Sequence, residues 1–305
     1  MACLRNEALR LPFWLRHNRR LGVSHFLIVD NGSEDGTREA LLGERDVSLW
    51  SAPGSYRASR FGLDWTDWLL MRYGTGHWTL TLDADELLVF PHWDTQGLSG
   101  LGRALEARRL PALGALMLDL CPDGPLGVGD HAAGDDPVRA LPLFDPGPYR
   151  VRTKPFTEAR WTQGGPRDRA FFADRPERAP TLNKIPFARW SRAFVHLNST
   201  HSLLPPRLNR VLPCEGAWDP ATAPGPTGVL LHTKFLPDAP RRAVEEKGRG
   251  EHFHHPSRLN DYYDAVAARP DLRDQALARL PSGINGSEWR QLEALGLLSR
   301  AGWNP

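Results

Sequence analysis

The sequence has few cysteines and no long apolar run. Three cysteines lie far apart, at Cys3, Cys121 and Cys214, and an odd, scattered set favours neither a disulfide framework nor a Cys-x-x-Cys metal site. No run approaches the roughly 18 apolar residues that a transmembrane helix needs. The first residues carry Glu7 within a mixed stretch, which is unlike a signal peptide. We therefore expect a protein of the reducing cytoplasm.

An excess of charge of one sign is also missing. The 305 residues hold 38 Lys and Arg against 36 Asp and Glu, a formal net charge of +2. Nucleic-acid-binding proteins usually carry a marked basic excess, so we expect no nucleic-acid partner. The first predicted helix does carry a group of arginines, Arg10, Arg16, Arg19 and Arg20. We interpret this group as a solvated face, which allows at most peripheral contact with the inner face of the membrane.

Strand and helix signals alternate over residues 1–90. Short apolar runs predict strands at residues 3–4, 25–30, 47–53 and 77–83. Apolar residues at helical spacing predict helices at 7–21, 38–43 and 57–73. Such units favour parallel strands joined by right-handed crossovers, and ligands of these sheets gather beyond the carboxyl ends of the strands.

The rest of the chain is richer in glycine and proline, of which the sequence has 28 and 27. Residues 121–182 show no clear periodicity, and we interpret them as long loops around a site. A helix near 97–109 and strands at 115–120, 183–190, 193–197 and 228–235 are also predicted. Three helical segments are expected near the end, at 238–250, 274–280 and 287–298.

The strongest chemical signal is an acidic turn after the strand at 77–83. In LTLDADELLVF, the carboxylates of Asp83, Asp85 and Glu86 follow apolar residues and are held at the edge of a sheet. Like charges this close disfavour one another unless a proton or a cation joins them. Mg²⁺ and Mn²⁺ suit such oxygen-rich clusters and commonly bridge carboxylates to substrate phosphates. A lone D-x-D is also compatible with a solvated acidic turn.

A second acidic motif follows the strand at 25–30. In FLIVDNGSEDGT, Asp30 ends the strand, and Asp35, Gly36 and Thr37 open the next helix. Acidic residues at these places cap helices. At the strand end they also bind the base or ribose in nucleotide folds, and both interpretations stay open for Asp30.

These motifs together resemble a known family. The segment LRNEALRLPFWLRHNRRLGVSHFLIVDNGSEDGT, followed by LTLDADEL, resembles the family 2-type glycosyltransferases with the GT-A fold, in the bacterial branch with the pattern DNGSTDGT…DADE. The resemblance covers residues 3–90 and continues more weakly in TQGGPRDR, LNKIPFARW, STHSLLPPRLNRV and LLHTKFL.

The resemblance implies an α/β fold of GT-A type, with a mainly parallel central sheet flanked by helices, a loop-rich acceptor half and C-terminal helices. Residues 1–240 would form the glycosyltransferase domain. Within it, residues 1–95 would be the nucleotide-binding half and residues 96–240 the acceptor half. Residues 241–305 would be a C-terminal helical extension.

The resemblance also implies roles for individual residues. Asn6, Glu7 and Asp30 would line the nucleotide pocket beside Asp83, and Arg57 is a candidate cation for binding the nucleotide's phosphates. Asp83, Asp85 and His232 would hold Mn²⁺ or Mg²⁺. Lys184 and Lys234 are further candidate cations for the phosphates. Taken alone, a histidine between apolar residues, as in LLHTKF, is more often a core histidine.

The implied function is that of a hexosyltransferase-like enzyme. It would move a sugar from a nucleotide-diphosphate sugar, UDP- or GDP-linked, to a glycan or lipid-linked acceptor in surface polysaccharide or lipopolysaccharide synthesis. Such a transfer, expected to invert the sugar, leaves a diphosphate whose growing charge a cation stabilises. Two alternatives stay open. One is a nucleotidyltransferase-like phosphoryl-transfer enzyme, although ACLRNEAL has no glycine for a phosphate loop. The other is a non-catalytic module that binds nucleotides or sugars.

An inverting transfer needs a base. Asp168 in GGPRDR and Asp119 at the end of the 115–120 strand are the candidates, with Glu158 as a further alternative. The neighbouring Arg167 and Arg169 either hold a phosphate or acidic sugar or form a basic surface loop.

Tryptophans and histidines add weaker signals. Trp65, Trp68 and Trp78 are interpreted as core, whereas Trp161 and Trp218, in predicted loops, are candidate sugar contacts. A cluster of histidines, His252, His254 and His255, is interpreted as a solvated turn rather than as a metal site.

Overall fold

A three-stranded parallel sheet forms from the first part of the chain. The computed structural model describes residues 1–251 and 259–305. The strands of this sheet pair in the order β1 (Ala2–Leu4), β2 (Phe26–Asp30) and β3 (Val47–Ser51). The connecting helices are α1 (Leu11–Leu21), α2 (Thr37–Leu42) and α3 (Leu63–Leu69), and α3 continues as a π-helical turn, η1 (Leu70–Gly74). The predicted α/β class with a parallel sheet is therefore confirmed.

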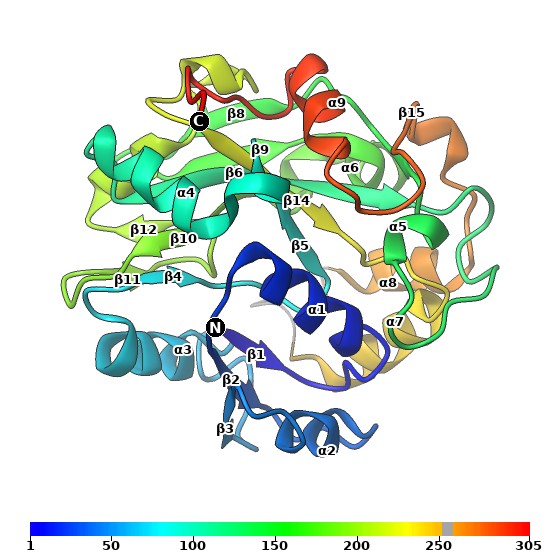
Figure 1. Cartoon of the computed structure of the whole chain (residues 1–305). Helices are drawn as coiled ribbons and strands as arrows, with labels where there is room; N and C mark the ends of the chain where they lie inside the picture. Colours follow the sequence, from blue (N-terminus) through cyan, green and yellow to red (C-terminus); the bar gives the residue numbers. More distant parts are fainter. Residues whose placement is uncertain (252–258) are drawn as a thin grey trace.

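A larger mixed sheet lies beside it (Figure 1). Its seven strands are β4 (Trp78–Leu80), β5 (Glu86–Val89), β6 (Ala112–Cys121), β7 (Leu143–Phe144), β10 (Asn183–Arg189), β14 (Thr227–His232) and β15 (Ala278–Arg279). Of the pairings between these described strands, only that of β6 with β14 is parallel. The prediction of a mainly parallel central sheet is therefore wrong for this part of the molecule.

Smaller elements complete the chain. A three-stranded antiparallel sheet contains β8 (Arg150–Thr153), β9 (Arg160–Gln163) and β13 (Gly216–Ala217), and a two-stranded one contains β11 (Val195–His196) and β12 (Leu203–Leu204). The remaining α-helices are α4 (Trp93–Ala107), α5 (Pro137–Ala140), α6 (Gly165–Phe171), α7 (Ala239–Arg249), α8 (Asn260–Ala267) and α9 (Glu288–Ala294). Every helix in the described ranges is too short or too polar to cross a bilayer.

The two sheets meet at the start of the chain. The Met1 carbonyl accepts a hydrogen bond from Leu82 N at 3.1 Å, and the Met1 amino group donates to the Leu80 carbonyl at 2.8 Å. β1 therefore lies between β2 and the segment that leads into the acidic turn. As a result, the carboxyl ends of β1 and of residues 80–82 open into the same region.

The register of β14 determines where His232, the last residue of this strand, lies. β14 lies between β5 and β6, with His232 opposite Glu86 on β5 and opposite Asp119 on β6. All six residues of β14 are buried. A histidine that ends this strand is therefore brought beside carboxylates from two neighbouring strands.

Several predicted boundaries change. The helix predicted at 7–21 begins at Leu11, because residues 7–10 form a turn in which the Glu7 carbonyl accepts from Arg10 N and Leu11 N; it ends, as predicted, at Gly22 with φ +100°. Residues 121–182 are not loops alone, since they contain α5, α6, β7, β8 and β9. The helix predicted at 274–280 is wrong, because β15 in this segment pairs with β7.

Candidate active site

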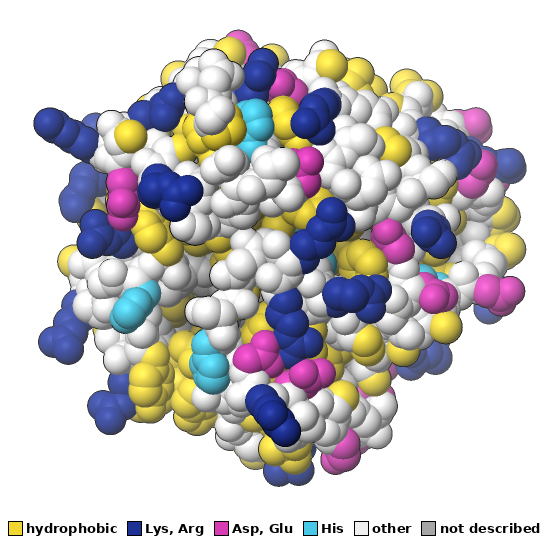
Figure 2. Space-filling view, in the orientation of Figure 1, with side chains coloured by type: hydrophobic (Ala, Val, Ile, Leu, Met, Phe, Trp, Pro, Cys, Tyr) yellow, Lys and Arg dark blue, Asp and Glu magenta, His cyan; other side chains and the backbone are white. Residues whose placement is uncertain are grey.

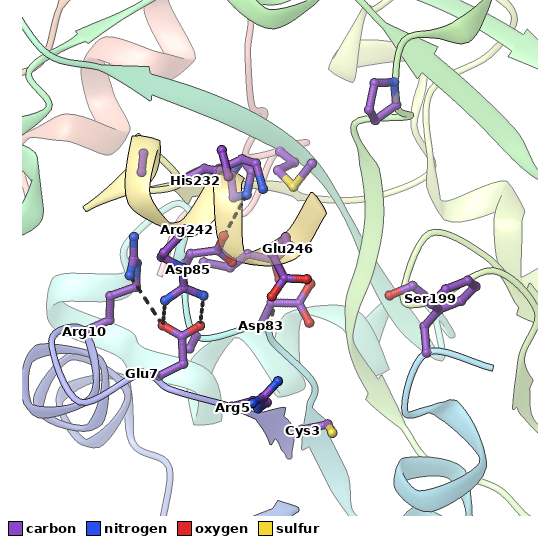
Figure 3. A pocket seen from close by; sticks show the side chains of 18 of the residues that line it. Cys3, Arg5, Glu7, Arg10, Asp83, Asp85, Ser199, His232, Arg242 and Glu246 are labelled. Atoms are coloured by element: carbon purple, nitrogen blue, oxygen red, sulfur yellow. Dashed lines mark hydrogen bonds and ion pairs between the residues drawn. The ribbon is translucent and has the colours of Figure 1, made fainter. Parts of the chain in front are cut away.

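A cavity of about 340 Å³ opens at the carboxyl ends of β1 and β14. The end of β1 contributes Arg5, the acidic turn contributes residues 83–86, and the end of β14 contributes His232. The inner face of α7 closes one side through Arg242 and Glu246. Figure 3 shows these side chains around one space. The cavity therefore lies at strand ends, where ligands of α/β sheets are expected.

Asp85 and His232 form the central contact. His232 Nε2 lies 3.1 Å from Asp85 Oδ2, and Figure 3 shows the two side chains facing each other. The Asp85 backbone is fixed as well, because its carbonyl accepts from Thr233 N at 2.7 Å and from Thr233 Oγ1 at 3.0 Å. The fold thus brings together two of the three predicted metal ligands, which lie 147 positions apart in the sequence.

Asp119 lies behind His232. Its Oδ1 atom is 2.6 Å from His232 Nδ1, and Arg167 Nε donates to its Oδ2 atom at 3.1 Å. The Asp119 side chain is buried and does not line the cavity. Both oxygens are occupied by His232 and Arg167, so Asp119 orients the imidazole and does not meet the geometric requirement for a base, which must reach the substrate hydroxyl.

The three groups adjust one another's pKa. Burial disfavours the charged imidazole, but Asp85 and Asp119 outweigh burial and raise the pKa of His232 above its ordinary value. Burial favours the neutral acid at Asp85, yet the charges of His232, Lys234 and Arg10 hold its pKa well below the usual range. The pKa of Asp119 is lowered too, because Arg167 and His232 overcome its burial. Both ring nitrogens face carboxylates, which only accept hydrogen bonds, so the imidazolium satisfies both.

Asp83 and Glu86 share a lysine. Lys184 Nζ lies 3.1 Å from Asp83 Oδ2 and 2.9 Å from Glu86 Oε1. Burial disfavours the ammonium, but these two acids raise the pKa of Lys184 above its ordinary value. Half of the Asp83 side chain is exposed, so this carboxylate still faces the cavity. The candidate cation Lys184 is thus used to neutralise the acidic turn.

Glu7 joins the start of the chain to α7. Its carboxylate lies 2.6 Å from Arg242 Nη2 and 3.5 Å from Arg10 Nη1. Arg10 also pairs with Asp238, at the N-terminus of α7, at 3.0 Å. Burial raises the pKa of Glu7, although both arginines favour its ionised form. Glu7 lines the cavity, and its main contacts hold the α7 wall in place (Figure 3).

Three predicted nucleotide residues do not line the cavity. Asn6 Oδ1 accepts a hydrogen bond from Glu34 N, and Asn6 Nδ2 donates one to Glu245 Oε1. Asp30 is buried and accepts from Ser33 N at 3.1 Å. Arg57 is exposed and donates its backbone N–H to Glu251. These three residues shape the loops around the cavity, and Asn31, next to Asp30, lines the wall instead.

The other predicted base and sugar contacts also lie elsewhere. Asp168 is 5% exposed and its Oδ2 atom is 2.9 Å from Arg150, whereas its neighbour Arg167 lines the cavity. Glu158 pairs with Arg210. Neither Asp168 nor Glu158 lines the cavity, and the same holds for Trp161 and for Trp218, which is buried and donates to the Leu297 carbonyl. The histidines at 252, 254 and 255 lie outside the described residues.

His201 is a cavity residue that the sequence did not single out. Its Nδ1 atom lies 2.7 Å from the Asn183 carbonyl oxygen, which can only accept, so Nδ1 carries the proton and Nε2 is left as an acceptor. Burial and the nearby Lys184, Arg167 and His232 hold the pKa of His201 well below its ordinary value. The available signal was its place in STHSLLPPRLNRV, a segment noted for its resemblance.

Among the described residues, two of the cations that line the cavity have no ion-pair partner. Seven Lys and Arg side chains line it against five Asp and Glu side chains, and Asp119 and Asp238 behind the wall pair with Arg167 and Arg10. Most of these charges pair with one another, but within the described part of the chain Arg5 and Lys234 form no ion pair. The cavity is therefore suited to a ligand that brings negative charge.

Comparison with known proteins gives little. No protein-family model and no curated protein sequence matches the chain. Among solved structures, a UDP-glucose pyrophosphorylase from Acinetobacter baumanii matches over 61% of this chain and 73% of that chain, with 11% sequence identity and a TM-score of 0.26. A likeness this slight carries no argument about fold or function.

The contacts of His232 with Asp85 and Asp119 predict how the free energy of unfolding depends on pH when a chelator removes divalent ions. Because the pKa of His232 is raised in the folded state, its stabilising effect is complete below about pH 6.5 and is lost as the pH rises through the folded value. The lowered pKa values of Asp85 and Asp119 preserve the effect down to about pH 4. We expect His232→Asn to cost about 3 kcal/mol near pH 6 and less at higher pH, measured by urea unfolding.

His201→Asn is the matched control. Because the pKa of His201 is lowered in the folded state, its protonation opposes folding as the pH falls, so the cost of this variant should increase with pH. A cost of His232→Asn that does not depend on pH would contradict the assigned ion pairs.

Proposed function

We propose that this protein is a metal-dependent glycosyltransferase of GT-A type that transfers a sugar from a nucleotide-diphosphate sugar to a glycan or lipid-linked acceptor. The observation that carries the proposal is the Asp85–His232 pair, oriented by Asp119, on the wall of a cavity that Arg5 and Lys234 also line. The family resemblance of residues 3–90 supports the same assignment.

The spacing of Asp85 and His232 fits two ligands of one divalent ion. Two ligand atoms at about 2.1 Å from an ion and at right angles lie about 3.0 Å apart, and Asp85 Oδ2 and His232 Nε2 lie 3.1 Å apart. A carboxylate on the far ring nitrogen, as Asp119 provides, is the usual support of a metal-binding histidine. Within the described residues, no group of three or more His, Cys, Asp and Glu is arranged to hold a metal. Asp83, which pairs with Lys184, therefore does not complete the predicted set with Asp85 and His232, and further ligands of the ion would have to come from substrate phosphates.

Other residues of the cavity would stabilise the leaving diphosphate or bind the ribose. When bound at Asp85 and His232, Mn²⁺ or Mg²⁺ would supply positive charge to the departing phosphate oxygens. Arg5 and Lys234, which lack ion-pair partners within the described chain, are available to the same oxygens. Lys184 lies 3.1 Å from Asp83 and offsets its charge, so Asp83 can accept a hydrogen bond from a ribose hydroxyl without repelling the phosphates.

His201 is our candidate for the base. The five cavity acids are all paired with basic side chains, whereas Nε2 of His201 is left as an acceptor; these acids are Glu7, Asp83, Asp85, Glu86 and Glu246. In an inverting transfer, Nε2 would take the proton of the acceptor hydroxyl. The hydroxyl oxygen would bond to the anomeric carbon as the bond from that carbon to the diphosphate breaks, with the electron pair leaving on the diphosphate.

The proposal predicts metal-dependent nucleotide binding. We expect UDP or GDP to raise the melting temperature of the protein only with Mn²⁺ or Mg²⁺. The reason is that the diphosphate would supply ligands to the ion, and the ion would bind the diphosphate to Asp85 and His232. Asp85→Asn should abolish the metal-dependent part, and Lys234→Ala should weaken nucleotide binding about tenfold by removing an unpaired cation. Lys247→Ala is the matched control, because Lys247 pairs with Asp264 outside the cavity.

The products identify the reaction class. Incubation with nucleotide sugars should release a nucleoside diphosphate, whereas a nucleotidyltransferase would exchange pyrophosphate with a nucleoside triphosphate. Nucleotide binding without metal, or unchanged in Asp85→Asn, would overturn the metal assignment. Pyrophosphate exchange would favour the nucleotidyltransferase alternative.

The assigned base predicts a separation of binding from turnover. His201→Gln should lower kcat by about 10² to 10⁴-fold and leave the dissociation constant of the nucleotide nearly unchanged, as measured by turnover and calorimetry. Added imidazole should restore part of the rate, which would not occur for a residue that only shapes the loop. A variant with normal kcat, or one that fails to bind nucleotide, would remove His201 from this role.

A further inference from the structure

An exposed apolar surface lies on α3 and η1. Trp68, Met71 and Tyr73 expose 52%, 41% and 47% of their surface, while Leu69 and Leu70 of the same segment are buried in the core. The prediction that Trp68 belongs to the core is therefore wrong. Large apolar side chains exposed together on a folded protein mark a place of interaction.

The rings of this surface form one cluster with the edge strand β3. Tyr73 lies 5.7 Å from Trp50 and 6.5 Å from Trp68, measured between ring centroids. We call Trp50, Trp68, Met71, Arg72 and Tyr73 the aromatic patch. Figure 2 shows hydrophobic side chains gathered over α3 at the lower left of the molecule, with Lys and Arg side chains beside them. The wider π-helical turn presents Met71, Arg72 and Tyr73 outward in succession.

The unbalanced charge of the aromatic patch is positive. Asp64 on α3 pairs with Arg60 at 2.7 Å, and Asp67 is buried against His196 at 2.6 Å. Arg72 lies 5.7 Å from the ring centre of Tyr73 and forms no ion pair within the described part of the chain. An anionic partner would therefore complement the patch.

We propose that the aromatic patch docks the protein on the surface of a lipid bilayer that contains anionic phospholipids. Trp and Tyr have an apolar ring and a polar tip and are enriched at membrane interfaces, and Arg72 would meet lipid phosphates. A symmetric contact between two copies would instead bring together two surfaces with the same unbalanced positive charge. Charge complementarity thus favours lipid over a second copy of the chain.

The patch is joined to the cavity by a short segment. Tyr56 and Phe61 line the cavity, and α3 begins at Leu63 directly after Gly62. Docking would therefore fix the helix that directly follows this part of the cavity wall. The docking itself follows from the patch and does not depend on the proposed function.

Sedimentation with vesicles tests the proposal. The full chain, without nucleotide or metal, should bind vesicles of phosphatidylcholine with about 25% phosphatidylglycerol and bind pure phosphatidylcholine more weakly. The double variant Trp68→Ser, Tyr73→Ser should lower binding about tenfold. Arg72→Glu should abolish the preference for anionic vesicles. Phe156→Ser is the matched control, because Phe156 is 97% exposed and does not belong to the aromatic patch. This variant should bind like the unchanged protein.

Fluorescence locates the contact in a variant that keeps its aromatic character. Trp68→Phe should retain vesicle binding and lose much of the quenching of tryptophan emission by bromine-labelled lipids. The absence of binding by the unchanged protein, or equal binding by the double variant, would overturn the proposal. A concentration-dependent dimer that the double variant dissociates would also overturn it, in favour of a second copy.

Discussion

The structure depends on the neutralisation of four carboxylates that meet at the strand ends. Asp83, Asp85 and Glu86 come from one short turn, and Asp119 comes from β6. Like charges at this distance destabilise one another unless cations lie between them. Lys184 from β10 joins Asp83 to Glu86, and His232 from β14 joins Asp85 to Asp119. The larger sheet brings both cations to the carboxylates.

This constraint explains why the site is built across strands of both directions. β14 is parallel to β6 and antiparallel to β5, and only this position places His232 opposite residues of both neighbours. In the proposed metal-bound form, a divalent ion would take the place of the proton on Nε2 of His232. Removal of this proton leaves a nitrogen and a carboxylate oxygen at the spacing of two ligands, so proton and divalent ion would compete for one position.

Much of the scaffold could be predicted from local pattern. The apolar run at 25–30, the glycine that ends α1 and the acidic turn at 83–86 are short-range signals, and each is found where it was expected. Asp168 shows the limit of such signals, because its neighbour Arg167 faces the cavity and Asp168 faces Arg150. Sequence spacing alone does not decide which of two adjacent helical residues points inward.

Contacts between residues far apart in the sequence could not be predicted either, because local spacing does not show which side chains meet in the fold. The contact of Glu7 with Arg242 joins positions 235 residues apart, and nothing in a polar helix distinguishes the arginine that meets a buried acid. His201 and the lysine partner of Asp83 depend on β10 and on the loop after β11. Trp68 was expected inside because its spacing is helical, yet the helix is apolar on its outer side too.

The central claim is that Asp85 and His232 hold a divalent ion against a diphosphate. The most direct measurement is anomalous X-ray scattering from crystals grown with Mn²⁺ and UDP or GDP. The account predicts an anomalous peak at about 2.0–2.2 Å from both Asp85 Oδ2 and His232 Nε2, in contact with phosphate oxygens. A bound nucleotide with the Asp85–His232 contact intact and the ion elsewhere would contradict it.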